Sequence, residues 1–235
     1  MREDICSIPI SEIFEPKDGC PFCRMRDMLE DRMATYITGA AMMEPDVRVE
    51  TNRLGFCHQH FEQILQRGRL SVALILESLL DEAGKDILPE DDKLAPKKIL
   101  AAADRRAHSC FVCENVEKNM QHLSATVIKL WQSEPEFRTL YSEQTHICLP
   151  HYSFILAAAQ KMPRKNFQPF AAETKRLAKN YLDTVKADTT HFCRMFDYRN
   201  AGGDWGNSRD AIERAITYLT SREPTVTTKT EGKNR

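Results

Sequence analysis

The sequence predicts an all-α protein of two similar halves, each held by a zinc site with three cysteine ligands and one histidine ligand, followed by a C-terminal helical extension. Three observations favour this fold. Apolar residues recur at spacings of three and four along several segments, and a Cys-x-x-Cys step precedes such a segment twice, with a Cys-x-x-His step after it each time. A third is that no segment is rich in the alternating apolar and polar residues of a half-buried β-strand.

Composition narrows the class of protein. The chain has 235 residues, with 33 Lys and Arg against 34 Asp and Glu, so its charge gives no overall attraction to nucleic acid or membrane. The longest apolar run, "SVALILESLL", contains Glu77 and is shorter than the ~20 residues that span a bilayer. The opening "MREDICSIPISEIF" lacks the apolar core of a secretory signal. We therefore expect a soluble cytoplasmic protein, in which eight cysteines favour metal sites or reactive thiols over disulfides.

The two halves align at a nearly constant offset, which predicts an internal duplication. Five residues of the first half recur ninety positions later in the second half: Cys20, Cys23, Glu44, Pro45 and Arg48 match Cys110, Cys113, Glu134, Pro135 and Arg138. After one inserted residue, Cys57, His60, Ile64 and Leu65 match Cys148, His151, Ile155 and Leu156. We expect the first half to span residues 1–88 and the second to span residues 89–162.

Helices follow from the spacing of apolar residues and from proline. One apolar stripe contains Val116, Met120, Leu123, Val127 and Leu130, and a comparable stripe in the first half contains Met25, Leu29, Tyr36 and Ala40. Pro45 and Pro135 cannot lie deep inside a helix, so each is expected near the start of a new one. Ser133 and Glu136 have the spacing of a capping box at the second of these starts. Phe61 to about Leu80 is expected to form one further helix.

The remaining segments complete the predicted order. "AGKDILPEDDKLAP" has the composition of a linker, and Pro96 suits the first turn of a helix that runs toward Cys110. Residues 163–221 are expected to form a C-terminal helical extension that packs on both halves, with a closing helix near Ile212 to Leu219. Residues 222–235 have little apolar content and are expected to be disordered.

The cysteine spacing predicts two structural zinc sites. Cys-x-x-Cys supplies two thiolates from one turn and Cys-x-x-His adds a thiolate and an imidazole, which closes a tetrahedron around Zn²⁺. Because the connections are shorter, we expect pairing within each half, with Cys20, Cys23, Cys57 and His60 as one set and Cys110, Cys113, Cys148 and His151 as the other. A swapped arrangement, in which Cys-x-x-Cys of one half joins Cys-x-x-His of the other, stays open. His58 is not expected as a ligand because it is adjacent to Cys57 and is Leu149 in the second copy.

Other uses of these cysteines fit the sequence less well. "CPFC" resembles a dithiol redox motif, so a thiol-based redox enzyme or a zinc-release redox switch is the alternative function. However, "CFVC" lacks the proline and no βαβ pattern surrounds either copy. Iron–sulfur ligation is disfavoured because ferredoxin-type spacings are absent, and a catalytic zinc would keep an open coordination position. Cys6 and Cys193 lie outside the repeat and are expected to be buried free thiols.

Five segments together resemble a bacterial domain family of unknown function. They are "GCPFC", "MEPDVRVETNRLGFCHQHF", "EPEFR", "CLPHY" and "FDYRNAGGDWGNSRDAIERAITYLT", and the resemblance extends from about Ile8 to about Thr220. It implies an architecture and no particular activity. It also draws attention to Glu44, Asp46, Arg48, Asp197, Tyr198 and Arg199, for which ion pairing and helix capping are favoured over a ligand site.

From these observations we expect a protein without enzymatic activity that binds two Zn²⁺ ions and serves as an interaction or regulatory module. Four protein ligands at each site leave no open coordination position, and no catalytic acid, base or nucleophile stands out. Such a module would act in the cytoplasm by binding another macromolecule or by self-association. Neither a membrane nor a nucleic acid is expected as its partner, because the basic pairs such as Lys97 and Lys98 are typical of solvated helix faces.

Overall fold

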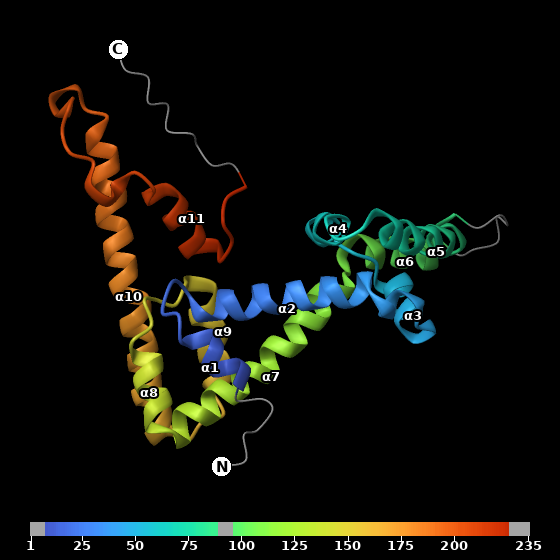
Figure 1. Ribbon diagram of the computed structural model, residues 1–235, viewed down its shortest axis with the longest axis horizontal. Helices are drawn as coiled ribbons and strands as arrows, with labels where there is room; N and C mark the ends of the chain where they lie inside the picture. Colours follow the sequence, from blue (N-terminus) through green and yellow to red (C-terminus); the bar gives the residue numbers. More distant parts are fainter. Residues whose placement is uncertain (1–7, 89–95, 226–235) are drawn as a thin grey trace. The chain divides into compact units, whose positions relative to one another are not determined.

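The computed structural model describes residues 8–88 and 96–225, and within these ranges the chain is helical and contains no strand (Figure 1). The α-helices are α1 (Ile8–Phe14), α2 (Pro21–Thr38), α3 (Pro45–Leu54), α4 (His58–Leu65), α5 (Arg69–Ile87), α6 (Pro96–His108), α7 (Phe111–Ser133), α8 (Pro135–Ser142), α9 (Leu149–Ala159), α10 (Arg164–Met195) and α11 (Ala211–Thr220). Three 3₁₀ helices are η1 (Ala40–Met43), η2 (Tyr198–Asn200) and η3 (Gly206–Ser208). The all-α prediction is confirmed. Cys6, the middle of the predicted linker and the predicted disordered tail from residue 226 onward lie outside the described residues.

The two predicted repeats contain similar successions of α-helices, although only the first has a 3₁₀ helix, η1, between its first two. A long helix follows each Cys-x-x-Cys step (α2 and α7), a short helix begins at Pro45 or Pro135 (α3 and α8), and a further helix begins directly after Cys57 or Cys148 (α4 and α9). Each succession ends with a long helix, α5 or α10. The duplication itself stays a prediction.

Two local predictions are wrong. The single helix expected from Phe61 to Leu80 is two helices, because the chain is extended at Gly68 (φ 174°) before α5 begins. The predicted capping box at Ser133 does not form, since the Ser133 hydroxyl donates to the Lys129 carbonyl (3.0 Å) within α7. Helix α8 instead begins with Pro135 at its first position, where the missing backbone donor costs nothing.

The described residues form two compact units, and each unit contains parts of both sequence repeats. The first unit comprises the residues up to Met25 and those from His122 onward, and the second comprises residues 26–121. Helices α2 and α7 therefore each contribute residues to both units.

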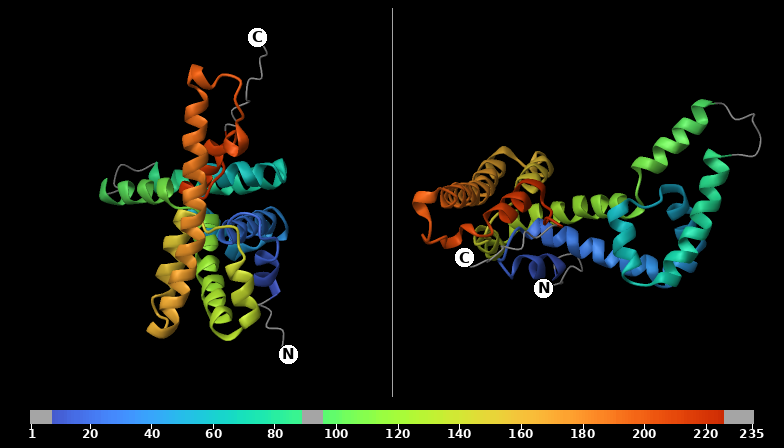
Figure 2. Two further views of the ribbon diagram at one scale, coloured as in Figure 1. Left: turned by 90° about the vertical axis from the view of Figure 1, so that its left-hand side faces the viewer. Right: turned by 90° about the horizontal axis from the view of Figure 1, so that it is seen from above.

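Aromatic side chains form much of the core of the first unit. The Phe14 ring stacks on Tyr141 with centroids 5.9 Å apart, and Trp131 meets Phe170 edge to face at 5.1 Å. The hydroxyl of Tyr141 is fully buried and lies 2.9 Å from the Thr174 hydroxyl oxygen. Helices α9, α10 and α11 pack against one another, with α11 returning beside α10 (Figure 2).

Aliphatic side chains form the core of the second unit. Helix α5 packs against α3 and α6, and Figure 2 shows α5 and α6 side by side. The buried residues include Ile37, Leu54, Ile64, Val72 and Ile75. Among the described residues, no helix has both the length and the apolar character that crossing a bilayer requires.

Candidate metal centres

The eight predicted ligand residues lie in two groups of four. The first cluster contains Cys20, Cys23, Cys148 and His151, and the second cluster contains Cys57, His60, Cys110 and Cys113. In each cluster the four ligand atoms all lie within 4.8 Å of one another. The predicted pairing within each sequence half is therefore wrong. Cys-x-x-Cys of each half instead joins Cys-x-x-His of the other, and each cluster lies within one compact unit.

Helix length explains why the pairing is exchanged between the halves. Helix α2 continues without a break from Cys23 to Thr38, and at 1.5 Å per residue it carries the chain about 22 Å along its axis. Helix α7 likewise carries the chain about 30 Å from Cys113 to Ser133. The short helices α3 and α8 that follow span only about 15 Å and 12 Å. Each Cys-x-x-His step therefore begins far along the chain path from the Cys-x-x-Cys step of its own half.

Each cluster forms where two helices begin. Cys57 and Cys148 are the N-cap residues of α4 and α9, and Cys20 and Cys110 directly precede α2 and α7. The second ligand of each step lies three residues later, in the first turn of the same helix. Because residues three apart lie on one face of a helix, each helix start presents a pair of ligand atoms. The positive ends of the helix dipoles also favour thiolates at these positions.

Distances in the first cluster match a tetrahedral zinc site. With Zn–S near 2.3 Å and Zn–N near 2.0 Å, such a site separates two sulfur atoms by about 3.8 Å and a sulfur from a nitrogen by about 3.5 Å. The sulfur atoms of Cys23 and Cys148 are 3.6 Å apart. Nδ1 of His151 lies 3.7 Å, 3.4 Å and 3.1 Å from the sulfur atoms of Cys20, Cys23 and Cys148.

The second cluster has the same geometry. The sulfur atoms of Cys57 and Cys113 are 3.9 Å apart. Nδ1 of His60 lies 3.1 Å from the sulfur of Cys57, 3.3 Å from that of Cys110 and 3.4 Å from that of Cys113. These sulfur separations are nearly twice the ~2.05 Å of a disulfide. Both donor sets therefore fit a metal ion with sulfur and nitrogen ligands.

Hydrogen bonds join the loops that precede the two ligand steps of the first cluster. Gln144 Nε2 donates to the Phe14 carbonyl (2.7 Å), and the Thr145 hydroxyl donates to the Lys17 carbonyl. Lys17 also forms an ion pair with Glu143 (2.5 Å). These contacts connect segments nearly 130 residues apart and hold the starts of α2 and α9 together.

A corresponding set of hydrogen bonds holds the second cluster. The backbone N–H of Phe111 donates to the Gly55 carbonyl (2.9 Å), and the Ser109 hydroxyl donates to the Leu54 carbonyl (2.7 Å). Gly55 has a φ of 63°, a conformation that glycine adopts without the steric cost of a side chain. Arg106 adds a bond from its guanidinium to the Asn52 carbonyl (2.9 Å). The end of α3 is thus fastened to the start of α7.

The first cluster is the more buried one. Cys20, Cys148 and His151 are buried, and Cys23 is half-buried. Burial by itself raises the pKa of Cys20, but hydrogen bonds from Cys148, Cys23 and His151 outweigh it and lower that pKa well below its usual value. The hydrogen bond between Cys23 and Cys148 raises the pKa of Cys23, and the hydrogen bond between Cys148 and Cys20 raises the pKa of Cys148 to about 12. Without a metal, Cys20 would therefore be a thiolate that accepts hydrogen bonds from the protonated thiols of Cys23 and Cys148.

The second cluster is open to solvent on one side, because Cys113 is exposed. The hydrogen bond from Cys113 lowers the pKa of Cys110 to about 3 and raises that of Cys113 itself. Burial alone would lower the pKa of His60, but its hydrogen bond with Cys110 and the nearby Glu30 carboxylate outweigh burial and raise the pKa to about 10.

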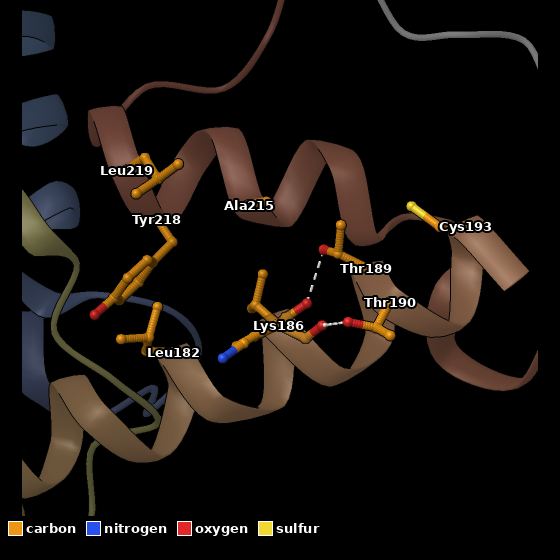
Figure 3. Close-up of a pocket in the computed structure, with 9 residues that line it drawn as sticks. Leu182, Lys186, Thr189, Thr190, Cys193, Ala215, Tyr218 and Leu219 are labelled. Carbon is orange, nitrogen blue, oxygen red and sulfur yellow. Dashed lines mark hydrogen bonds between the residues drawn. The ribbon is translucent and has the colours of Figure 1, made fainter.

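The other polar and sulfur-bearing residues singled out above lie elsewhere. His58 belongs to neither cluster, as expected; its side chain is exposed, and its Nε2 lies 3.6 Å from Oε1 of Glu62. Cys193 is exposed, so its expected burial is wrong. It lies at the end of an apolar groove of about 250 Å³ between α10 and α11, beyond Thr189 and Thr190 (Figure 3). His191 Nε2 is 2.9 Å from the Asp204 carbonyl oxygen and so has a partner other than this thiol.

The "FDYRN" segment has the capping and ion-pairing role that was favoured for it. Asp197 accepts a hydrogen bond from the backbone N–H of Arg199 (3.0 Å) and caps η2. The two side chains also form an ion pair (2.5 Å). In the first repeat, Glu44 is the N-cap residue of α3 and its carboxylate accepts a long hydrogen bond from the Tyr36 hydroxyl (3.4 Å).

Glu30 is a neighbour of the second cluster that sequence reasoning missed. Its carboxylate is buried, and Oε1 lies 3.6 Å from Nε2 of His60. No local pattern could have identified it, because the contact depends on how α2 packs against α4.

A model of a protein family described as a family of unknown function matches residues 1–226 of the chain. No curated protein matches it. No solved structure matches it either.

Proposed function

The chain belongs to this family, DUF6062, and we propose that it is a helical protein with two structural Zn²⁺ sites that serves as an interaction or regulatory module in the cytoplasm. Cys20, Cys23, Cys148 and His151 would hold one ion, and Cys57, His60, Cys110 and Cys113 the other. Bound zinc would supply a cross-link between helix starts.

One observation carries this proposal: each cluster presents four sulfur and nitrogen atoms at tetrahedral separations. Structural zinc sites have such closed sets, whereas catalytic zinc keeps a position for water or substrate. Three thiolates and Zn²⁺ leave a formal charge of minus one, which the helix N-termini offset. The clusters also link segments 125 and 56 residues apart, so a metal would remove much chain entropy from the unfolded state.

Exposed apolar side chains support a role in binding another macromolecule or a second copy. In the second unit, Leu70, Leu88 and Leu100 are each at least two-thirds exposed, and Phe196 in the first unit is 71% exposed. Large apolar residues that the described part of the chain leaves exposed are typical of interaction surfaces when they gather on one face.

Metal analysis with thiol counting on the purified protein tests the proposal. We expect two equivalents of zinc per chain, with the six cluster thiols protected from alkylation until a chelator is added. Iron, or a full count of reactive thiols in metal-free but folded protein, would contradict two structural zinc sites. Size-exclusion chromatography with light scattering then tests self-association.

A thiol-based redox function is the second candidate, and the second cluster favours it. Cys113 is exposed, and its partner Cys110 has a pKa lowered to about 3 by their hydrogen bond, so a thiolate and an accessible thiol lie together. We expect a redox switch to release one zinc under mild peroxide and to recover it after reduction. Retention of both ions under these conditions would exclude the switch.

A further inference from the structure

The two clusters differ in the neighbours of their histidine. In the second cluster, Nδ1 of His60 faces the three sulfur atoms, and Nε2, on the opposite side of the ring, lies 3.6 Å from Oε1 of Glu30. In the first cluster, the ring neighbours of His151 are Phe22 and Phe154, with centroids 6.0 Å and 6.2 Å from its own. The residue that matches Glu30 in the repeat is Met120.

Glu30 and His60 are both almost completely buried, with 3% and 1% of their surfaces exposed. A buried carboxylate is costly unless charged or polar groups surround it. Gln63 Nε2 donates to Oε2 of Glu30 (3.2 Å), and Arg26 Nε lies 4.0 Å from Oε1. The carboxylate is thus held at one place, and the oxygen that Gln63 does not bind is the one directed to His60.

We propose that Glu30 positions His60 for metal binding through Nδ1 by accepting a hydrogen bond from its Nε2–H. The second cluster would then contain a carboxylate–histidine–metal triad. A carboxylate behind a ligating imidazole selects the tautomer with hydrogen on the distal nitrogen, orients the ring and increases the basicity of the ligating nitrogen. This role rests on the proposed function, because it matters only where His60 binds a metal. It makes the two metal sites chemically different although their ligand types are the same.

A matched pair of variants of the full-length protein tests the proposal. Glu30→Gln keeps the shape of the side chain and removes its charge. Glu62→Gln removes a carboxylate that lies at the same 3.6 Å from an imidazole on the same helix, but that imidazole is the exposed His58. Zinc competition with a chromophoric chelator measures both binding events in each protein.

We expect Glu30→Gln to weaken one of the two binding events by about 10- to 100-fold and to leave the other unchanged. Glu62→Gln should match the native protein in both. If native protein binds two zinc ions and Glu30→Gln keeps both affinities, the role of Glu30 is excluded while the zinc proposal stands. Failure of the native protein to bind two zinc ions would instead refute the proposed function.

Nitrogen NMR of the zinc-loaded native protein supplies a readout that does not depend on a variant folding. Long-range ¹H–¹⁵N correlation of His60 should show a protonated Nε2 and a metal-bound Nδ1, and this pattern should weaken or become mixed in Glu30→Gln. Metal binding through Nε2, with the proton on Nδ1, would overturn the proposal.

Discussion

Cys23 and Cys148 are separated by 125 positions in the sequence, yet their sulfur atoms lie 3.6 Å apart. Each belongs to a different sequence repeat, so the first cluster exists only when both repeats are folded. The same holds for Cys57 and Cys113 in the second cluster. Metal binding would therefore couple the folding of the two repeats.

Removal of one ligand should expose the thiols of its spatial partners. We expect Cys148→Ser to make Cys20 and Cys23 reactive toward iodoacetamide while Cys110 stays protected, because Cys148 shares its cluster with the former pair. Alkylation mapped by mass spectrometry checks this. Cys193→Ser is the control, since this exposed thiol belongs to neither cluster. New reactivity at Cys110 and Cys113, with Cys20 still protected, would indicate pairing within the halves.

Removal of metal should destabilise the fold. A ligand that binds only the folded state adds about 4 kcal/mol to the free energy of unfolding when its concentration is 1,000 times its dissociation constant. The two clusters hold the starts of four helices together. We expect chelation to lower the melting temperature by roughly 10 °C or more. Circular dichroism with and without chelator measures it, and re-addition of zinc should restore the transition. An unchanged melting curve after verified metal loss would be the contrary result.

Metal affinity should rise with pH. Cys148 has a pKa raised to about 12 by its hydrogen bond to Cys20, and the pKa of His60 is raised to about 10, so both carry protons near neutral pH. Zinc must displace these protons, and fewer need displacing as the pH rises. Each displaced proton corresponds to about a tenfold gain in affinity per pH unit. Chelator competition between pH 6.5 and 8, corrected for the chelator, should show this slope; a flat profile would contradict it.

The buried Tyr141 hydroxyl should contribute to the stability of the first unit. Thr174 donates its own proton to the Phe170 carbonyl (2.8 Å), so Tyr141 is the donor in their 2.9 Å hydrogen bond. Tyr141→Phe should cost about 1 kcal/mol of unfolding free energy, measured by urea denaturation. Tyr198→Phe is the control, because Tyr198 is 86% exposed and should lose less than about 0.5 kcal/mol. Equal stability of Tyr141→Phe and native protein would exclude the contribution.

Sequence patterns predicted most helices but fewer local details. Proline marked the starts of α3, α6 and α8, because its fixed φ and missing donor suit the first turn. The break at Gly68 was missed because apolar residues continue on both sides of it. Cys193 was expected to be buried from residue type alone, but the closing helix leaves it at the open end of a groove.

The sequence by itself determined which candidate ligands pair locally. Cys-x-x-Cys and Cys-x-x-His at helix starts place two donors on one face, and this follows from helix geometry over three residues. Only the tertiary structure decided which pairs meet. That choice depends on the unbroken length of α2 and α7 and on bonds such as that from Phe111 N–H to the Gly55 carbonyl, 56 residues apart. Glu30 reaches His60 for the same reason: contacts between distant helices have no short-range signal in the chain.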